Sequence, residues 1–278
     1  MTHVAMTIAG SDSGGGAGIQ ADLKTFQELG VFGTSAITAV TAQNTLGVHG
    51  VWPLGGEAVT AQTDAVFGDF EVSAVKTGML FSAEIIRAVA RSLEEADRPA
   101  LVVDPVMIAK GGANLLQQEA VDALAKELIP LAAVITPNIP EAEVLTGMDI
   151  RSESDMEKAG RSLLGMGARA VIVKGGHRTD ERRASDLYMD RDGSRMVLSS
   201  ERIHTKDTHG TGCTFSAALT AFLAAGQTLP DAAEGAKRFI QAAISDGLGI
   251  GSGHGPTNHW AYHRIGGMSA KGAITVES

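Results

Sequence analysis

Short apolar runs alternate with longer segments of helical periodicity along most of the chain, and this alternation constrains the fold more than any other feature. The apolar runs are rich in valine and isoleucine and are not interrupted by regularly spaced polar residues. Runs of this kind are typical of parallel strands that are buried on both faces. Strands are therefore predicted at residues 4–9, 35–41, 73–77, 100–103, 132–136 and 170–174.

The segments between these runs place apolar side chains on one helical face. Ser82 and Ser154 are predicted to cap helices, and Pro230 is predicted as the first residue of another. Repeated alternation of strand and helix predicts right-handed βαβ units in a three-layer α/β/α fold with a mainly parallel central sheet. The predicted helices are residues 17–29, 56–67, 83–95, 117–128, 155–164, 214–225 and 230–247.

One part of the chain departs from this pattern. Residues 184–189 and 195–199 flank the turn-forming run 190–193, so they predict a small β-hairpin. We find no internal repeat and no linker long enough to divide the chain, which predicts one large α/β domain.

The charge and the cysteine content limit the function classes. A net charge of −9 argues against a nucleic-acid or membrane-surface partner. The single cysteine, Cys213, excludes an intrachain disulfide and fits a reducing compartment. Residues 1–9 lack the features of a signal peptide, and the most apolar stretch, near residues 215–225, is too short to span a bilayer. A cytoplasmic location is expected.

Polar and glycine residues recur where the predicted strands end. In an open parallel sheet, ligands bind beyond the carboxyl ends of the strands. The convergence of these segments therefore predicts a binding site at one edge of the sheet. The segments are residues 10–18, 43–45, 78–79, 104–107, 137–141 and 175–177.

The run from Thr208 to Cys213 is predicted to hold phosphate. Gly210 and Gly212 allow a tight turn and a close approach to a ligand, and an apolar helix is predicted to follow. The free N–H groups at the start of such a helix bind anions, and in phosphoryl transfer they stabilise the charge on the moving phosphate. The alternative interpretation is an ordinary glycine turn before a core helix.

Cys213 is a candidate general base. A helix N-terminus lowers the pKa of a thiol, so Cys213 is expected to accept a proton from an attacking hydroxyl group. The alternative is a small apolar filler, which is the usual role of a buried free cysteine.

Asn138, Glu141 and Asp104 offer hard oxygen ligands of the kind that Mg²⁺ prefers. A helix-capping role for Asn138 and a solvated Glu141 stay open as the alternative. Lys174 ends an apolar strand, where it either meets phosphate or emerges into solvent.

Other motifs limit the classes of nucleotide-binding site that the chain can contain. Residues 16–21 match the dinucleotide pattern G-x-G-x-x-A, but Gln43 and Asn44 stand where an acidic residue is expected. No G-x-x-x-x-G-K-[ST] run is present, which excludes a P-loop kinase. The Gln43 amide can donate and accept together, which matches a heteroaromatic edge with an amino group beside a ring nitrogen. The histidines form no metal-spaced pair and are predicted on the surface or in loops: His177, His204, His209 and His254.

These motifs occur together in one known family. From about residue 4 to residue 256 the chain resembles the hydroxymethylpyrimidine/phosphomethylpyrimidine kinases of the ribokinase-like superfamily. On this basis a kinase domain is expected at residues 1–257, followed by a C-terminal tail at 258–278. The segments that carry the resemblance are 9–24, 39–45, 75–80, 104–107, 136–143, 174–177 and 209–215.

The resemblance implies transfer of the ATP γ-phosphate to 4-amino-5-hydroxymethyl-2-methylpyrimidine and then to its monophosphate, with Mg²⁺ as cofactor, by a homodimer. Cys213 falls where most of the superfamily has an aspartate base. The implied catalytic residues are Gly210, Thr211, Gly212 and Cys213, and the implied pyrimidine site is Gln43, Gly10, Asp22, Met79 and Val106. The predicted ATP site is Asn138, Lys174, Thr208, Gly210 and Gly212, and the predicted metal ligands are Asp104, Asn138 and Glu141, of which the resemblance implies Asn138 and Glu141 through an Asn-x-x-Glu motif.

Three other functions stay open on the sequence. A pyridoxal kinase is the nearest, because that substrate also carries a hydroxymethyl group on a nitrogen heterocycle. The dinucleotide pattern raises a nicotinamide-dependent oxidoreductase. A non-catalytic pyrimidine-binding module is the third.

Overall fold

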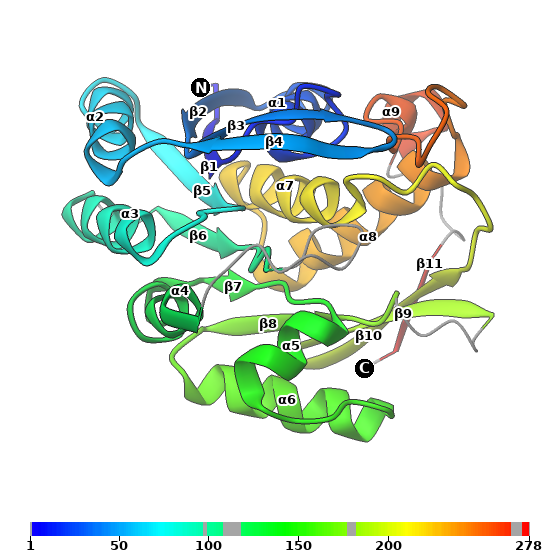
Figure 1. Ribbon diagram of the computed structural model, residues 1–278. Coiled ribbons are helices and arrows are strands. Elements are labelled where there is room, and N and C mark those ends of the chain that lie inside the picture. The colour runs from blue at the N-terminus through cyan, green and yellow to red at the C-terminus, as the bar shows by residue number, and fades with distance from the viewer. Residues whose placement is uncertain (1, 97–98, 108–117, 177–181, 268–273, 278) are drawn as a thin grey trace.

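The computed structural model describes residues 2–96, 99–107, 118–176, 182–267 and 274–277, and a nine-stranded sheet runs through it (Figure 1). The strand order is β11-β10-β9-β8-β7-β6-β5-β1-β2. The parallel strands are β1 (Val4–Ala9), β2 (Phe32–Ile37), β5 (Val72–Thr77), β6 (Ala100–Val103), β7 (Val134–Ile135) and β8 (Ala170–Lys174). Antiparallel pairing adds β9 (Arg183–Asp190), β10 (Arg195–Glu201) and β11 (Ile274–Glu277).

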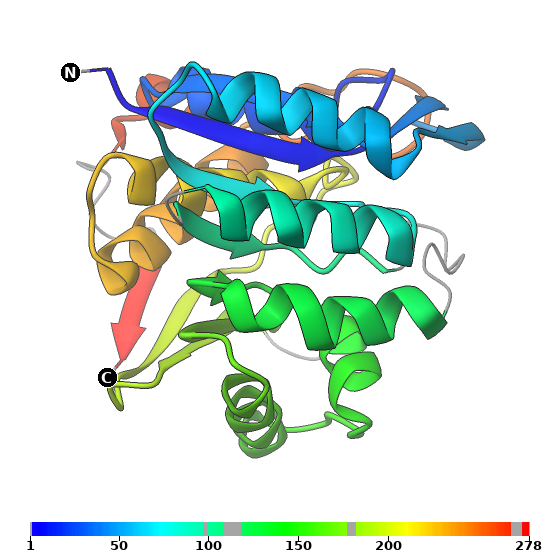
Figure 2. The same cartoon turned by 90° about the vertical axis from the view of Figure 1, so that its left-hand side faces the viewer.

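Helices cover both faces of this sheet, which confirms the predicted three-layer α/β/α fold. One face carries α1 (Gly18–Glu28), α7 (Thr211–Ala224), α8 (Leu229–Ser245) and the short α9 (Ala261–Arg264). The other carries α2 (Gly56–Phe67), α3 (Ala83–Glu95), α4 (Gln118–Ala123), α5 (Ile139–Thr146) and α6 (Glu153–Gly165), of which α2, α3 and α4 form a row (Figure 2). One apolar cluster fills the side of the sheet that α2–α6 cover, and two fill the side that α1, α7 and α8 cover.

The predicted strand at residues 35–41 is wrong, because the chain turns within it at Thr38. The Thr38 N–H donates to the carbonyl of Ala9, and its hydroxyl donates to the carbonyl of Met79 at 2.6 Å. These bonds end β2 and start β3 (Ala39–Asn44), which pairs antiparallel with β4 (Gly47–Pro53). The two strands form a sheet of their own beside the main one (Figure 1).

Other element boundaries also differ from the predictions. Ser152, not Ser154, caps α6, because its hydroxyl and the Asp155 carboxylate satisfy each other's backbone N–H groups. Thr228 caps α8, so Pro230 is its second residue. The predicted helix 117–128 is present from residue 118 as α4 and a π-helical turn (Leu124–Leu128), and Gln117 lies outside the described residues. The strand predicted at 132–136 is only Val134–Ile135.

Two other predictions are confirmed. Ser82 caps α3 by accepting a hydrogen bond from the N–H of Ile85. The predicted hairpin forms as β9 and β10 and extends the main sheet. No helix within the described part of the chain has both the length and the apolar character to cross a membrane.

The C-terminal segment packs against the rest of the molecule. Asn258 is fully buried, and the ring of Tyr262 lies 5.2 Å from that of Phe239 and 6.5 Å from that of Phe222. β11 pairs with β10 and forms the edge of the sheet. The division between a domain at residues 1–257 and a tail stays a prediction.

Candidate active site

A cavity of about 660 Å³ lies at the carboxyl ends of the parallel strands, between the β3–β4 hairpin and the start of α7. Apart from Asp22, every residue proposed from the sequence as a site residue lines it. These are Gly10, Gln43, Met79, Asp104, Val106, Asn138, Glu141, Lys174, Thr208, Gly210, Thr211, Gly212 and Cys213. Residues that are far apart in the sequence therefore face one space.

The start of α7 forms one end of this cavity. Gly210 caps the helix in the left-handed conformation at φ +80°, and a Cβ atom there would lie 1.7 Å from the carbonyl oxygen of Gly16. Only glycine fits this approach. A glycine cap also has no side chain to bond the first N–H groups of the helix, so those of Gly212 and Cys213 can bind an anion.

Cys213 lies on the cavity wall, but its electrostatic environment differs from the one expected. Burial raises the pKa of its thiol to about 11, and nearby Asp104 and Asp22 add to this effect. The ammonium group of Lys76 opposes it only in part. The expectation that the helix start would lower this pKa is therefore wrong: desolvation of the thiolate outweighs the helix. The resting thiol is neutral at pH 7.

Lys174 extends from β8 toward the same helix start. Its Nζ lies 3.2 Å from Oδ1 of Asp104 and close to Gly212, where a Cβ atom would be 3.3 Å from it. The other oxygen of Asp104 accepts a hydrogen bond from Ser216 at 3.0 Å. Burial alone would raise the pKa of Asp104, but the charges of Lys174 and Lys76 outweigh it and lower the pKa. Lys174 is thus a cation held beside the anion-binding N–H groups.

Asn138 and Glu141 form a capping box at the start of α5, a helix absent from the sequence-based prediction. Oδ1 of Asn138 accepts from the N–H of Glu141 at 2.9 Å, and Oε2 of Glu141 accepts from the N–H of Asn138 at 2.8 Å. The alternative interpretation of Asn138 as a cap is confirmed, whereas that of a solvated Glu141 is wrong, because Glu141 is only 4% exposed. Burial raises the pKa of Glu141 to about 7, although Lys174 opposes the shift.

The carboxylates of Asp104 and Glu141 suit a magnesium ion better than a protein-enclosed metal centre. Within the described ranges, no three Asp, Glu, His or Cys side chains gather as a metal site. Mg²⁺ usually binds through one or two carboxylates and completes its shell with water and substrate phosphates. A buried carboxyl group with a pKa near 7 is also one whose charge a cation would stabilise. The donor set therefore fits the ion.

Asp22 does not reach the cavity. It is fully buried, and its Oδ2 accepts hydrogen bonds from the Thr7 hydroxyl at 2.6 Å and from Nζ of Lys76 at 2.9 Å. Lys76, which sequence reasoning missed, lines the cavity instead. Gly10 and Met79 pack together there, because a Cβ atom on Gly10 would lie 2.5 Å from the Met79 methyl group.

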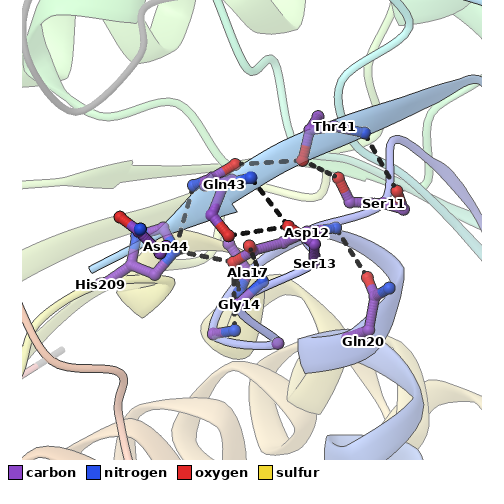
Figure 3. Close-up of polar contacts among 12 residues, drawn as sticks. Ser11, Asp12, Ser13, Gly14, Ala17, Gln20, Thr41, Gln43, Asn44 and His209 are labelled. Atoms are coloured by element: carbon purple, nitrogen blue, oxygen red, sulfur yellow. Dashed lines mark hydrogen bonds and ion pairs between the residues drawn. The ribbon is translucent and has the colours of Figure 1, made fainter. Parts of the chain in front are cut away.

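The glycine loop after β1 closes around Asp12 (Figure 3). The Asp12 carboxylate accepts from the N–H groups of Gly14, Gly16 and Ala17 at 2.8, 3.1 and 2.9 Å. These N–H groups are turned toward a side chain of the protein, so they are not directed at a pyrophosphate. The G-x-G-x-x-A match is therefore structural, and the geometry gives no support to a nicotinamide-dependent oxidoreductase.

His209 lies in the loop before α7, as predicted, but sequence reasoning did not anticipate its contacts in the cavity wall. Its side chain is largely buried, and Nε2 lies 2.8 Å from Oδ2 of Asp12 and 3.3 Å from Nε2 of Gln43. Gln43 lies within β3, so the prediction that it follows the end of a strand is wrong. The Asp-Ser-Gly-Gly-Gly run signals a turn around Asp12, but no local pattern links it to a histidine so distant in sequence. His177 lies outside the described residues.

Comparison with known proteins adds independent findings. The sequence model of a family described as phosphomethylpyrimidine kinase matches residues 12–258. The chain is 59% identical to hydroxymethylpyrimidine/phosphomethylpyrimidine kinase of Bacillus subtilis, over 94% of this chain and 96% of that protein. It is 58% identical to the enzyme of that name from Haemophilus influenzae, over 94% and 97%.

Solved structures of vitamin kinases also match. A pyridoxal kinase from Staphylococcus aureus in complex with AMP-PCP and pyridoxal superposes with a TM-score of 0.88 at 38% identity, covering 100% of this chain and 98% of that one. A phosphomethylpyrimidine kinase from Clostridium difficile gives a TM-score of 0.78 at 45% identity, covering 87% and 100%. The fold is therefore shared between kinases that carry either name.

Proposed function

The chain belongs to the phosphomethylpyrimidine kinase family, and we propose on that premise that it phosphorylates 4-amino-5-hydroxymethyl-2-methylpyrimidine and then its monophosphate, with ATP as donor, in thiamine biosynthesis. The observation that carries this proposal is the shared cavity. It places the Gln43 amide at one side and the N–H groups at the start of α7 at another. A ring and a transferable phosphate can thus occupy one enclosed space.

The start of α7 is the proposed phosphate site. Gly212 and Cys213 lie in the first turn of α7, and Nζ of Lys174 lies beside Gly212, so their N–H groups and the ammonium would together stabilise the charge on a phosphoryl group in transfer. Thr208 lines the same cavity, and its proposed role is to contact ATP. These groups would position the phosphates and neutralise their charge, and such effects supply most of the catalysis in phosphoryl transfer.

Cys213 is the proposed proton acceptor. As the substrate hydroxyl oxygen bonds to the γ-phosphorus, the bond to the β-phosphate oxygen breaks and ADP leaves. The hydroxyl proton would pass to Sγ of Cys213 in its thiolate form. A pKa of about 11 makes that form scarce at pH 7, so the base contributes less than the phosphate-binding groups.

Asp104, Asn138 and Glu141 are the residues that would hold Mg²⁺, and the bound ion would neutralise charge on the ATP phosphates. The Asn138 amide already bonds the N–H of Glu141 through Oδ1, so its contribution is to orient Glu141 as much as to bind. We also propose that the protein is a homodimer, because the family resemblance implies it. We propose a cytoplasmic location, because a single cysteine fits a reducing compartment.

Pyridoxal kinase is the second candidate, favoured by the superposition on the Staphylococcus aureus enzyme. The higher identity to the pyrimidine kinases, 59% against 38%, supports the first. Steady-state kinetics with both substrates at the same ATP concentration separates them. We expect a higher kcat/KM for the pyrimidine, and a tenfold preference for pyridoxal would reverse the assignment.

A coupled assay of ADP release tests the two steps. The purified protein should release two ADP for each hydroxymethylpyrimidine consumed, and the diphosphate should accumulate. One ADP for each pyrimidine would restrict the enzyme to the first step. Absence of substrate-dependent ADP release would leave only a binding module.

A further inference from the structure

The contact between Asp12, His209 and Gln43 joins three parts of the cavity wall (Figure 3). Asp12 lies in the loop after β1, Gln43 lies in β3, and His209 immediately precedes the Gly210 cap of α7. The His209 ring is held in place by its surroundings, because a Cβ atom on Gly16 would lie 2.6 Å from it. None of the functions assigned above uses this histidine.

The hydrogen-bond donors around Asp12 determine where the His209 proton lies. Three backbone N–H groups and Nε2 of His209 surround the Asp12 carboxylate, which is 2% exposed. Burial alone would raise the pKa of Asp12, but His209 and the loop N–H groups outweigh it, so the pKa is lowered. An ionised carboxylate only accepts hydrogen bonds. Nε2 of His209 must therefore carry a proton and donate.

This requirement determines the orientation of the neighbouring amide. The single Nε2–H of His209 is donated to Asp12, and the Gln43 side-chain atom 3.3 Å from Nε2 lies beside this polarised N–H, where an oxygen is favoured electrostatically over an NH₂ group. The other end of the amide is 3.5 Å from Oγ1 of Thr41. The Thr41 hydroxyl already donates to the carbonyl of Ser11 at 2.8 Å, so it can accept from an N–H. Both neighbours favour Oε1 toward His209 and Nε2 toward Thr41.

We propose that Asp12 and His209 are positioning residues that fix the orientation of the Gln43 amide and thereby select the ring edge that the cavity accepts. This inference rests on the proposed pyrimidine kinase function. In the fixed orientation, Gln43 keeps one lone pair and one N–H for a ligand. These match an exocyclic amino group beside a ring nitrogen. A pyridine ring without that amino group leaves the oxygen unpaired, which is costly in a buried site.

A double-mutant cycle tests this role. We expect His209→Ala to raise KM for hydroxymethylpyrimidine about tenfold, to change KM for ATP less than about twofold, and to lower the preference for pyrimidine over pyridoxal. If His209 acts through Gln43, it should have little further effect on the pyrimidine KM in a Gln43→Ala background. The proposal would be refuted if the losses in pyrimidine affinity were additive in the double variant. It would also be refuted if His209→Ala raised KM equally for the pyrimidine and for pyridoxal.

Two further variants control for packing. His209→Gln keeps an N–H donor that can reach Asp12 and should recover most of the pyrimidine affinity. His204→Ala removes an exposed histidine from the same segment and should leave both KM values unchanged. Failure of His209→Gln to recover any affinity would assign the ring only a packing role.

Nitrogen NMR of the wild-type protein tests the inference without any assay of activity. We expect the Nε2 of His209 to be protonated, and an unprotonated Nε2 would overturn the argument for the amide. Calorimetric binding of the pyrimidine gives the same mutant cycle without turnover. A protein that binds pyrimidine with this coupling but releases no ADP would refute the proposed function and leave the positioning role intact.

Discussion

Cys213 combines a place on the cavity wall with a resting pKa that is unfavourable for a base. Burial raises that pKa to about 11, so roughly one molecule in 10,000 carries a thiolate at pH 7. The thiol is nevertheless on the cavity wall, in the first turn of α7, where Gly212 and Cys213 offer N–H groups to an anion. Its proposed function as a base would therefore depend on the small ionised fraction.

The first prediction follows from this titration. Cys213→Ala should stay folded and keep near-normal ATP affinity, and kcat should fall by about 10²-fold or more because proton transfer is lost. Because the thiol deprotonates as pH rises, kcat of the wild type should increase between pH 6 and 9, and the variant should lose that increase. Unchanged kcat in both phosphorylation steps would show that the Cys213 side chain only fills space in the core.

Glu141 gives the second prediction. Its pKa in the folded protein, about 7, lies above the ordinary 4.5, so the protonated form is favoured by folding. The associated stability is complete below pH 4.5 and is lost as pH rises through 7, by up to about 3 kcal/mol. Mg²⁺ binds the ionised form and should restore stability. Thermal unfolding should therefore show a larger Mg²⁺-dependent rise in Tm at pH 8 than at pH 5.

Glu141→Gln is the matched variant for that experiment. An amide of the same shape does not titrate, so this part of the pH dependence should disappear and the Mg²⁺ effect should shrink. A variant that responds to Mg²⁺ as the wild type does would place the ion elsewhere.

Sequence patterns predicted which individual residues line the cavity where a strand end or a helix start determines their place. Gly210, Gly212 and Lys174 are examples, because each adjoins an element that the hydrophobic pattern reveals. The Asp12–His209 contact could not be predicted, because it joins side chains 197 residues apart. The raised pKa of Cys213 was missed for a similar reason, since desolvation depends on the packing of the whole site.

At the scale of elements, the start of α7 connects two parts of the cavity wall, because its cap contacts the loop after β1. Its cap makes the close approach to the loop after β1, and Thr214 continues the helix by donating its N–H to the carbonyl of Gly210 at 2.8 Å. The far end of the same helix offers a comparison. Gly226 is also left-handed, at φ +84°, but a Cβ atom there would meet nothing within 4 Å.

This pair of glycines gives the third prediction. Gly226→Ala should cost about 1 kcal/mol of stability from backbone strain alone and leave kcat unchanged. Gly210→Ala adds a collision with Gly16 and should lower kcat by about 10²-fold or more, because the anion-binding N–H groups move. Thermal unfolding and kcat of both variants check this. Equal effects on kcat would mean that α7 does not hold the phosphate.

The elements that sequence reasoning missed share a physical cause. The β4 strand begins at Gly47 and is interrupted by Gly50, so its apolar pattern is weak. Helix α5 is short, carries Pro140 near its start and depends on the capping box for its N-terminus. The break at Thr38 depends on hydrogen bonds to distant carbonyls. Strands buried on both faces and long amphipathic helices need no such contacts to be recognised.

At the scale of the whole molecule, the β3–β4 hairpin extends beyond the main sheet with one face exposed. The inner face contributes Gln43 and Val51 to the cavity. The outer face presents the cross-strand pair Val40 and Trp52, which are 46% and 59% exposed. The Trp52 ring lies against Gly50, where a Cβ atom would be 2.6 Å away. A two-stranded sheet is marginal alone, and exposed tryptophan is enriched in interfaces.

The last prediction is that a second copy of the chain covers this outer face. Sedimentation velocity of the wild type should give the mass of a dimer, and Trp52→Glu should shift it toward the monomer because the charge would be buried without a partner. Val144→Glu is the matched control, since Val144 is 48% exposed on α5, away from the hairpin, and should leave the dimer intact. A monomeric wild type would contradict the homodimer. A dimer that survives Trp52→Glu would place the interface elsewhere.

Because Gln43 is on the same hairpin, dimer loss should also weaken pyrimidine binding more than ATP binding.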